Sequence, residues 1–351
     1  MFSGLGIVPL ILIFGAAAAA VWFAGIYLSK STDALDTQLG FGQALGGAIL
    51  LAFATNLPEL AITVSAALAH DLGIAIGNIL GGIAIQTVVL VVLDIAMGKE
   101  SALTTRAASL VLGLEGLLVI FVLAIAIMGA QLPPGRPFGR VEPAALLITL
   151  GWLAGLWLVN RAGRGLPWQD TTGTAPGAQP EPMGHSKAKK AKGMSLALAG
   201  GIFAAGAAVT LVAGVVLERS GEQIAGHVGI SGVVFGATIL AAATALPEVS
   251  TGIASVRLGD FQLAVSDIFG GNAFLPVLFL VASVVSGSAI LPQAQPTDIY
   301  LTALGIVLTI VYGWGLITRP HRQVLRMGID SLTVVVLYAA GIAGLIAVSN
   351  H

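Results

Sequence analysis

The heptapeptides "ATNLPEL" at Ala54–Leu60 and "ATALPEV" at Ala243–Val249 share an unusual composition. Each lies inside a long apolar stretch that predicts a membrane-spanning helix. Within such a helix a proline removes a backbone hydrogen bond, and a carboxylate is costly enough that it usually marks a functional site. Because the same costly combination occurs twice, the sequence indicates a shared function for both copies.

The composition is that of a membrane protein. Of the 351 residues, 56% are hydrophobic and 9% are charged, whereas a soluble domain has about 25% charged residues. The net charge of −1 gives no indication of a nucleic-acid partner. The chain has no cysteine, which excludes disulfides and thiolate metal sites. The first apolar run has no basic residue before it and is too long for a typical signal peptide, so we interpret it as the first span.

Apolar runs of roughly 20 residues predict an all-α polytopic membrane protein with ten transmembrane helices. The predicted spans are about 4–28, 41–68, 72–94, 102–128, 143–160, 194–217, 230–256, 262–286, 298–317 and 327–348. Short polar turns separate most of these spans. The exception is residues 161–193, which are rich in Pro, Gly and charge and which we interpret as a flexible linker.

The basic residues predict the orientation of the spans. With both termini outside, thirteen of the 16 Lys and Arg residues fall on the inner side, and only Arg136, Arg140 and Arg219 fall outside. Cytoplasmic loops carry the excess of basic residues. We therefore expect both termini outside, the 161–193 linker in the cytoplasm, and the chain in the plasma (inner) membrane.

The two heptapeptides belong to a longer internal repeat. One constant shift aligns residues 24–92 with residues 213–281 without a gap, through the turns as well as the apolar runs. Five predicted spans precede the linker and five follow it, so residues 1–160 and 194–351 are expected to be two five-helix repeats inserted in opposite directions. Inverted repeats with interrupted helices are typical of secondary transporters, and the interrupted segments mark the ion site.

Each heptapeptide offers hard oxygen ligands for a cation. It combines a carboxylate, a hydroxyl four residues earlier on the same helical face, and a carbonyl that the proline leaves without a donor. These groups belong to Glu59, Thr55 and Ala54 in the first copy, and to Glu248, Thr244 and Ala243 in the second. Together they supply six or more oxygens and two charges, which suits dehydrated Ca²⁺. The alternative is that the prolines merely kink the helices and the glutamates bond to neighbouring helices.

The spans that follow the heptapeptides carry further polar residues. Asn78, Gly82 and Gln86 recur every four residues in the third span. The corresponding residues of the eighth span are Asp267, Gly271 and Leu275. Asp267 lies inside an apolar span, which favours a functional role. The glycines fit close helix packing equally well.

Glu115 lies about halfway along the fourth predicted span, outside both heptapeptides. It fits either a proton path or a carboxylate with a purely local hydrogen bond, and the sequence leaves both open. None of the five histidines lies within a predicted span, so a histidine-based metal site or proton relay has no support.

The motifs resemble those of the calcium/cation antiporter superfamily, which includes sodium/calcium and proton/calcium exchangers. Its two alpha-repeats carry a pattern like G-T-S-L-P-E followed by G-N-x-x-G-S-N-x-x-N or -D. Here the first repeat reads "ATNLPE" and "GNILGGIAIQ", and the second reads "ATALPE" and "SDIFGGNAFL". The resemblance covers residues 40–94 and 229–286, and the ten-span layout extends it to the whole chain.

The resemblance implies roles for several residues. The central carboxylates of the family fall on Glu59 and Glu248, and its threonines fall on Thr55 and Thr244. The chain departs from the family pattern at flanking positions. Asn56 and Ala245 replace a serine, Gly82 and Gly271 replace a serine, Gln86 and Leu275 replace Asn and Asp, and Asp267 replaces an Asn. The calcium-type centre is thus kept, while the flanking counter-ion ligands are altered.

These features predict a secondary antiporter that exchanges Ca²⁺ for H⁺ or Na⁺ by alternating access, with the first and sixth spans as the moving elements that the resemblance implies. We favour H⁺, because two protons neutralise both glutamates without further ligands and because Asn56 resembles the N-x-x-E spacing of proton/calcium exchangers. The alternatives are a cation channel or an ion-binding family member that does not transport.

The chain has no HExxH motif, no serine elbow and no convincing aspartate pair, so an enzyme is not expected. No resident cofactor is expected either. The expected partners are small inorganic cations and the lipid bilayer.

The predicted orientation can be tested in this cysteine-free chain. An Ala175→Cys variant should react with membrane-impermeant thiol reagents only from the cytoplasmic side, and a Gln293→Cys variant only from outside. The opposite labelling pattern would overturn both the span count and the inverted repeat.

Overall fold

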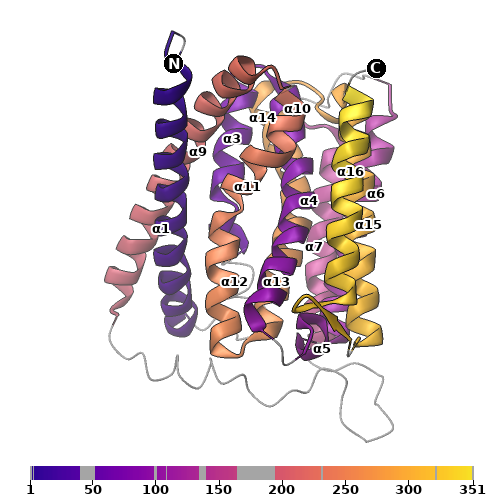
Figure 1. The fold of residues 1–351 in the computed structure, drawn as a ribbon. Coiled ribbons are helices and arrows are strands. Elements are labelled where there is room, and N and C mark those ends of the chain that lie inside the picture. The colour runs from indigo at the N-terminus through magenta and orange to yellow at the C-terminus, as the bar shows by residue number, and fades with distance from the viewer. Residues whose placement is uncertain are drawn as a thin grey trace, which may run out of the picture.

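A computed structural model describes most of the chain as a bundle of helices (Figure 1). The described residues are 2, 4–39, 52–98, 101–107, 109–133, 140–163, 194–230, 232–320 and 322–349. Most helices run along one common axis, and helix α1 (Ile7–Leu39) begins at the same end of the bundle where helix α16 (Ile329–Ser349) ends. The predicted linker falls outside the described residues except for its first three, which end helix α7 (Pro143–Gly163).

Every helix or strand that the structure describes in the first half is a helix. Besides α1 and α7 these helices are α3 (Leu57–Leu68), α4 (Leu72–Met97), α5 (Leu103–Ala107) and α6 (Leu110–Ala130). The α4 helix is deeply placed, with 72% of its membrane-spanning window buried, whereas only 22% of the α1 window is buried.

The described residues of the second half contain several interrupted helices. Before α16 its helices are α9 (Leu196–Val228), α10 (Gly232–Phe235), α11 (Ala241–Thr244), α12 (Leu246–Leu258), α13 (Phe261–Phe274), α14 (Leu278–Ser286) and α15 (Pro296–Thr318). A π-helix at Gly236–Leu240 joins α10 to α11, and 3₁₀ turns occupy Leu275–Val277 and Leu291–Gln293. Strands β1 (Gln323–Val324) and β2 (Met327–Gly328) form an antiparallel hairpin before α16.

The described residues contain eight helices that are long and apolar enough to cross a membrane. A ninth is reached if Gly236–Thr244 and Leu246–Leu258, which meet at a bend of 51°, count as one broken span. The second predicted span begins at residue 41, but residues 41–51 lie outside the described part. Within the described part, this span consists of residues 52–55 and α3. The membrane-spanning helical fold is therefore confirmed, and the number ten stays a prediction.

Several predicted boundaries were wrong, each for a physical reason. Helices α1 and α9 continue well past the predicted ends at residues 28 and 217, because polar residues end an apolar run without ending a helix. The α9 helix ends instead where Gly229 adopts a left-handed conformation (φ 72°).

Other differences come from local breaks inside predicted spans. The span at 102–128 is divided into α5 and α6, and the Ser109 side chain caps α6 by accepting a hydrogen bond from the Val111 amide. The span at 262–286 contains a 3₁₀ turn at Pro276, which lacks an amide hydrogen. The hairpin before α16 was not predicted.

The sequence repeat is matched by a repeat in local geometry. Asp71 and Asp260, which are equivalent under the repeat, cap α4 and α13 with nearly identical backbone angles (φ −95° and −94°, ψ 73° for both). Each carboxylate accepts a hydrogen bond from the amide three residues later, at 3.4 Å for Asp71 and 3.1 Å for Asp260. The duplicated segments thus begin their helices alike, as a true repeat requires.

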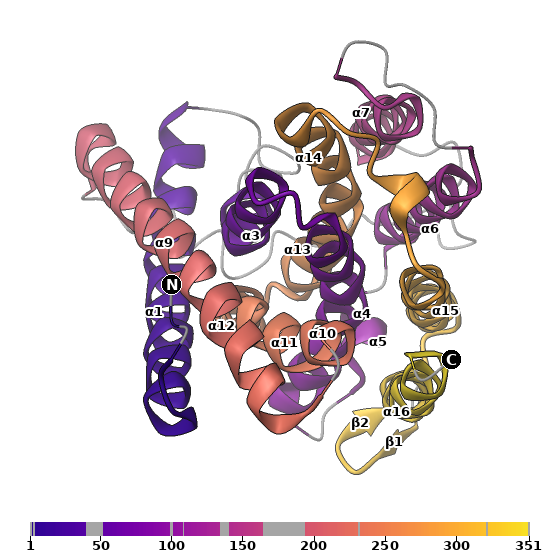
Figure 2. The same cartoon turned by 90° about the horizontal axis from the view of Figure 1, so that it is seen from above.

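Seen from above, the bundle has three parts (Figure 2). Helices α1 and α9 pack together on one side. Helices α6, α7, α15 and α16 lie on the other side. The broken helices that carry the two heptapeptides lie between them, next to α4 and α13.

Candidate cation site

Both heptapeptides lie where a helix is interrupted. Asn56 (φ −85°, ψ 14°) separates residues 52–55 from α3, and Ala245 (φ −78°, ψ 2°) separates α11 from α12. The interruptions fall just before Pro58 and Pro247, each in the first turn of the following helix, where the missing amide hydrogen is tolerated. Glu59 and Glu248 therefore occupy first turns, where the helix dipole stabilises negative charge.

One amide side chain joins the two carboxylates. Gln86 of α4 places Nε2 at 3.4 Å from Glu59 Oε1 and at 3.3 Å from Glu248 Oε1. The same nitrogen lies 3.2 Å from Oδ1 of Asn56. All four side chains are fully buried. Two carboxylates from opposite halves of the sequence thus meet at one point inside the bundle.

The side chain of each heptapeptide threonine contacts a carboxylate of the other half. The Thr244 side chain interacts with the carboxyl of Glu59, and the Thr55 side chain interacts with the carboxyls of Glu248 and Asp267. Each hydroxyl also donates to the carbonyl three residues before it, at 3.3 Å for Thr55 and 3.1 Å for Thr244. Each hydroxyl predicted as a ligand therefore lies beside the glutamate of the opposite heptapeptide, not beside the one with which the sequence grouped it.

Asp267 adjoins this centre. Its Oδ2 accepts a hydrogen bond from Thr251 at 2.6 Å, and Thr251 also bonds to the backbone oxygen of Glu248 at 3.2 Å. Asn78, its counterpart in the first repeat, donates to the backbone oxygen of Glu59 at 3.4 Å. Both residues of this pair thus approach the turn that carries the glutamate of their own half.

Several buried oxygens around this centre have no hydrogen-bond donor within the described part of the structure. They are Glu59 Oε2, Glu248 Oε2, Asn78 Oδ1, Gln86 Oε1, Asp267 Oδ1 and Asn272 Oδ1. Every one of them is an acceptor. A buried acceptor without a partner is costly, and a cluster of such oxygens is satisfied by a cation that takes oxygen ligands.

The remaining predicted residues are two alanines, which offer backbone carbonyls, and two glycines, which differ in how closely they pack against the centre. Ala54 and Ala243 are buried, and the prolines four residues later cannot donate to their carbonyls. Gly271 makes room for the centre, because a β-carbon there would lie 2.7 Å from Nδ2 of Asn56. A β-carbon at Gly82 would lie 3.5 Å from Cδ1 of Leu275.

Glu115 is separate from these groups. Its carboxylate accepts a hydrogen bond from Ser266 at 3.0 Å. Ser266 precedes Asp267 in the sequence, but within the described residues no hydrogen bond joins Glu115 to either central glutamate. Of the two hypotheses for Glu115, this geometry fits the local hydrogen bond.

Sequence reasoning missed three buried polar residues near the centre. Thr251 supports Asp267, and Asn272 donates from Nδ2 to the hydroxyl of Thr87 at 3.0 Å. The signal for Asn272 was present in "GGNAFL", where it directly follows the second glycine. Polar residues inside apolar spans at such positions point inward more often than outward.

Among the described residues, no three His, Cys, Asp or Glu side chains are close enough to form a metal site by themselves. The centre instead combines two carboxylates that share one amide with neutral oxygens from threonine, asparagine and glutamine. This ligand set suits hard cations such as Ca²⁺ and Na⁺.

The fold and this oxygen-lined centre define a helical membrane protein with an internal candidate cation site. The chain belongs to the sodium/calcium exchanger protein family, whose family model matches residues 9–159 and 198–347. The inner membrane protein YrbG of Escherichia coli K12 is 27% identical over 331 residues, which cover 92% of this chain and 91% of YrbG. The chain is therefore a membrane cation antiporter of the exchanger family, as its motifs predicted.

Solved structures share the fold. The H⁺/Ca²⁺ exchanger CAX superposes with a TM-score of 0.66 at 10% identity, covering 97% of this chain and 87% of CAX. The sodium-calcium exchanger NCX_Mj superposes with a TM-score of 0.62 at 14% identity, covering 96% of this chain and 99% of NCX_Mj. At these identities the likeness concerns the fold, and it includes exchangers with different counter-ions.

The role of Gln86 can be tested by removing its amide. Replacing Gln86→Leu removes the shared donor and one free oxygen, so Ca²⁺ binding should weaken at least about tenfold, since a contact with a charged group contributes roughly 1.5–3 kcal/mol. Isothermal titration of purified protein with Ca²⁺ measures the change. Leu345→Ile is the control at a buried apolar position away from the centre. Unchanged affinity in Gln86→Leu would show that the amide does not hold the carboxylates.

Proposed function

We propose that this chain exchanges Ca²⁺ for H⁺ by alternating access, with Glu59 and Glu248 as the residues that bind either cation in turn. The observation that supports this most strongly is the meeting of both carboxylates at Gln86. Two carboxylates balance one divalent cation, and two protons balance the same charge. The charge of this glutamate pair is therefore balanced in both loaded states, which limits the cost of charge inside the bilayer.

The remaining ligands of the proposed Ca²⁺ site come from both halves. Thr55 and Thr244 supply hydroxyls, the Ala54 and Ala243 carbonyls supply backbone oxygens, and Asn56, Asn78, Gln86 and Asp267 supply side-chain oxygens. Several of these oxygens are buried without a donor in the described structure, which leaves them free for a cation. Six to eight oxygens are typical of Ca²⁺.

The residues around the centre favour H⁺ over Na⁺ as the counter-ion. Binding several Na⁺ ions at once requires oxygen ligands beside the central pair, and three positions where such ligands are expected carry none. Of these three, Gly82 packs against Leu275, and Gly271 lies against the Asn56 amide. A proton needs only the carboxylate that binds it, so these substitutions do not weaken H⁺ exchange.

The proposed exchanger has ten membrane spans in two inverted five-helix repeats, at residues 1–160 and 194–351. Both termini lie outside and the 161–193 linker is cytoplasmic. The matched caps at Asp71 and Asp260 support equivalent folds for the two halves. Because the two repeats are inverted, each contributes one carboxylate from an oppositely oriented set of helices. Movements that open the centre to one side of the membrane or to the other are therefore similar in energy.

The central pair is tested by charge removal. Glu59→Gln and Glu248→Gln should each abolish Ca²⁺ exchange in proteoliposomes without unfolding the protein, because each removes one of two balancing charges. The exposed Glu222→Gln on α9 is the control and should exchange normally. Thr55→Ala and Thr244→Ala should slow exchange without abolishing it, because water can replace a neutral hydroxyl ligand. Wild-type rates in both glutamine variants would contradict the site.

The counter-ion is tested with imposed gradients. Uptake of ⁴⁵Ca²⁺ into proteoliposomes should follow a pH gradient in Na⁺-free medium, because two protons exchange for one Ca²⁺ at the central pair. The matched experiment imposes a Na⁺ gradient at equal pH on both sides. Flux that requires the Na⁺ gradient and ignores the pH gradient would instead assign Na⁺ as the counter-ion.

A further inference from the structure

Helices α1 and α9 each touch the heptapeptide of the other half through a glycine. A β-carbon at Gly25 of α1 would lie 2.8 Å from Cα and 2.9 Å from Cβ of Pro247. A β-carbon at Gly214 of α9 would lie 3.0 Å from the carbonyl oxygen and 3.2 Å from Cα of Pro58. The shift that aligns the two repeats pairs the two glycines with each other, and likewise the two prolines. The contacts are therefore equivalent under the repeat, and each leaves no room for a side chain.

These contacts lie directly beside the central carboxylates. Pro58 and Pro247 precede Glu59 and Glu248 in the sequence, within the same first helical turn. Any shift of a proline backbone therefore moves the glutamate that follows it. The first helix of each half thus abuts the turn that sets the position of the other half's carboxylate.

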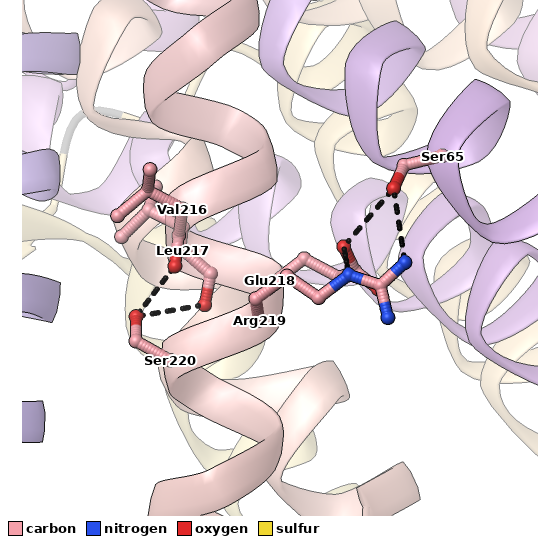
Figure 3. Close-up of polar contacts among 6 residues, drawn as sticks. All are labelled: Ser65, Val216, Leu217, Glu218, Arg219 and Ser220. Carbon is pink, nitrogen blue, oxygen red and sulfur yellow. Dashed lines mark hydrogen bonds and ion pairs between the residues drawn. The ribbon is translucent and has the colours of Figure 1, made fainter. Parts of the chain in front are cut away.

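The α9 contact has an additional polar clamp, which we define as Ser65, Glu218 and Arg219 (Figure 3). Ser65 of α3 donates to Glu218 Oε2 at 3.4 Å, and Arg219 reaches both Ser65 Oγ at 3.5 Å and Glu218 Oε2 at 3.3 Å. Glu218 is only 3% exposed. The repeat counterpart of Ser65 is Ala254, which has no polar side-chain atom, so the α1 contact lacks this bond.

From these contacts we infer that Gly25 and Gly214 are positioning residues of the cation site, each holding the carboxylate of the opposite half. Gly25 of α1 holds Glu248 through Pro247, and Gly214 of α9 holds Glu59 through Pro58. The polar clamp reinforces only the second of these. This inference rests on the proposed role of the two glutamates as the cation-binding pair.

The test is a crossed labelling experiment in Gly25→Ala and Gly214→Ala. Each purified variant is treated with a hydrophobic carbodiimide, and peptide mass spectrometry measures the labelling of Glu59, Glu248 and Glu115. Gly214→Ala should change the Glu59-to-Glu248 labelling ratio roughly fivefold, the factor that about 1 kcal/mol represents. Gly25→Ala should change it in the opposite sense. Labelling of Glu115, which contacts neither glycine, is the internal reference.

The matched controls are Gly15→Ala and Gly226→Ala, since an added β-carbon at either glycine has no heavy atom within 4 Å. Neither should change the ratio. Ser65→Ala, which removes the clamp without adding volume, is the milder second variant and should shift labelling of Glu59 alone. It keeps the inference testable if an alanine at Gly214 prevents folding.

The labelling readout does not depend on transport, so it remains informative even if the protein moves no Ca²⁺. The same variants in Ca²⁺ exchange assays should show a raised KM at either glycine. Equal labelling changes at both glutamates, or none in any variant, would overturn the positioning role. Crossed labelling changes without Ca²⁺ exchange in the wild type would keep the positioning role and refute the proposed function.

Discussion

The structure depends on keeping two carboxylates together inside a bilayer. Two like charges at one buried point repel each other and lose their hydration, so they require counter-charge or protons. In the bundle, the carboxylates of Glu59 and Glu248 share the side-chain amide of Gln86. The second oxygen of each carboxylate, Oε2, has no hydrogen-bond donor in the described structure. Such an arrangement is stable when a cation or protons are bound, and the exchange proposed above rests on this condition.

The interrupted helices make this meeting geometrically possible. A continuous helix uses its backbone groups internally, whereas a break before a proline releases carbonyls and turns the next helix by 51° in the second half. The break also places each glutamate at a helix start, where the dipole stabilises negative charge. Gly25 and Gly214 then let α1 and α9 approach the two prolines closely. Breaks, caps and glycine contacts all recur at equivalent positions of the two repeats.

Hydropathy predicted the membrane-spanning helical fold, which is confirmed. The fixed interval and the costly motif singled out Glu59 and Glu248, whose carboxylates the structure brings together, while their role as cation ligands and the inverted repeat stay predictions. The sequence did not predict helix ends set by local chemistry, such as the continuation of α1 to Leu39 or the cap at Ser109. It identified Gln86 as part of a polar stripe but not as the bridge between both glutamates. That bridge depends on the packing of α4 between the two halves, which no local pattern reveals.

We propose that Glu59 and Glu248 together hold one divalent cation. Anomalous diffraction from crystals soaked with Sr²⁺, a substitute for Ca²⁺, tests this most directly. We expect one dominant anomalous peak between the two carboxylates, beside Gln86, that disappears in Glu59→Gln. A dominant peak at Glu115 or at the Ser65–Glu218 clamp, with none between the two glutamates, would contradict it.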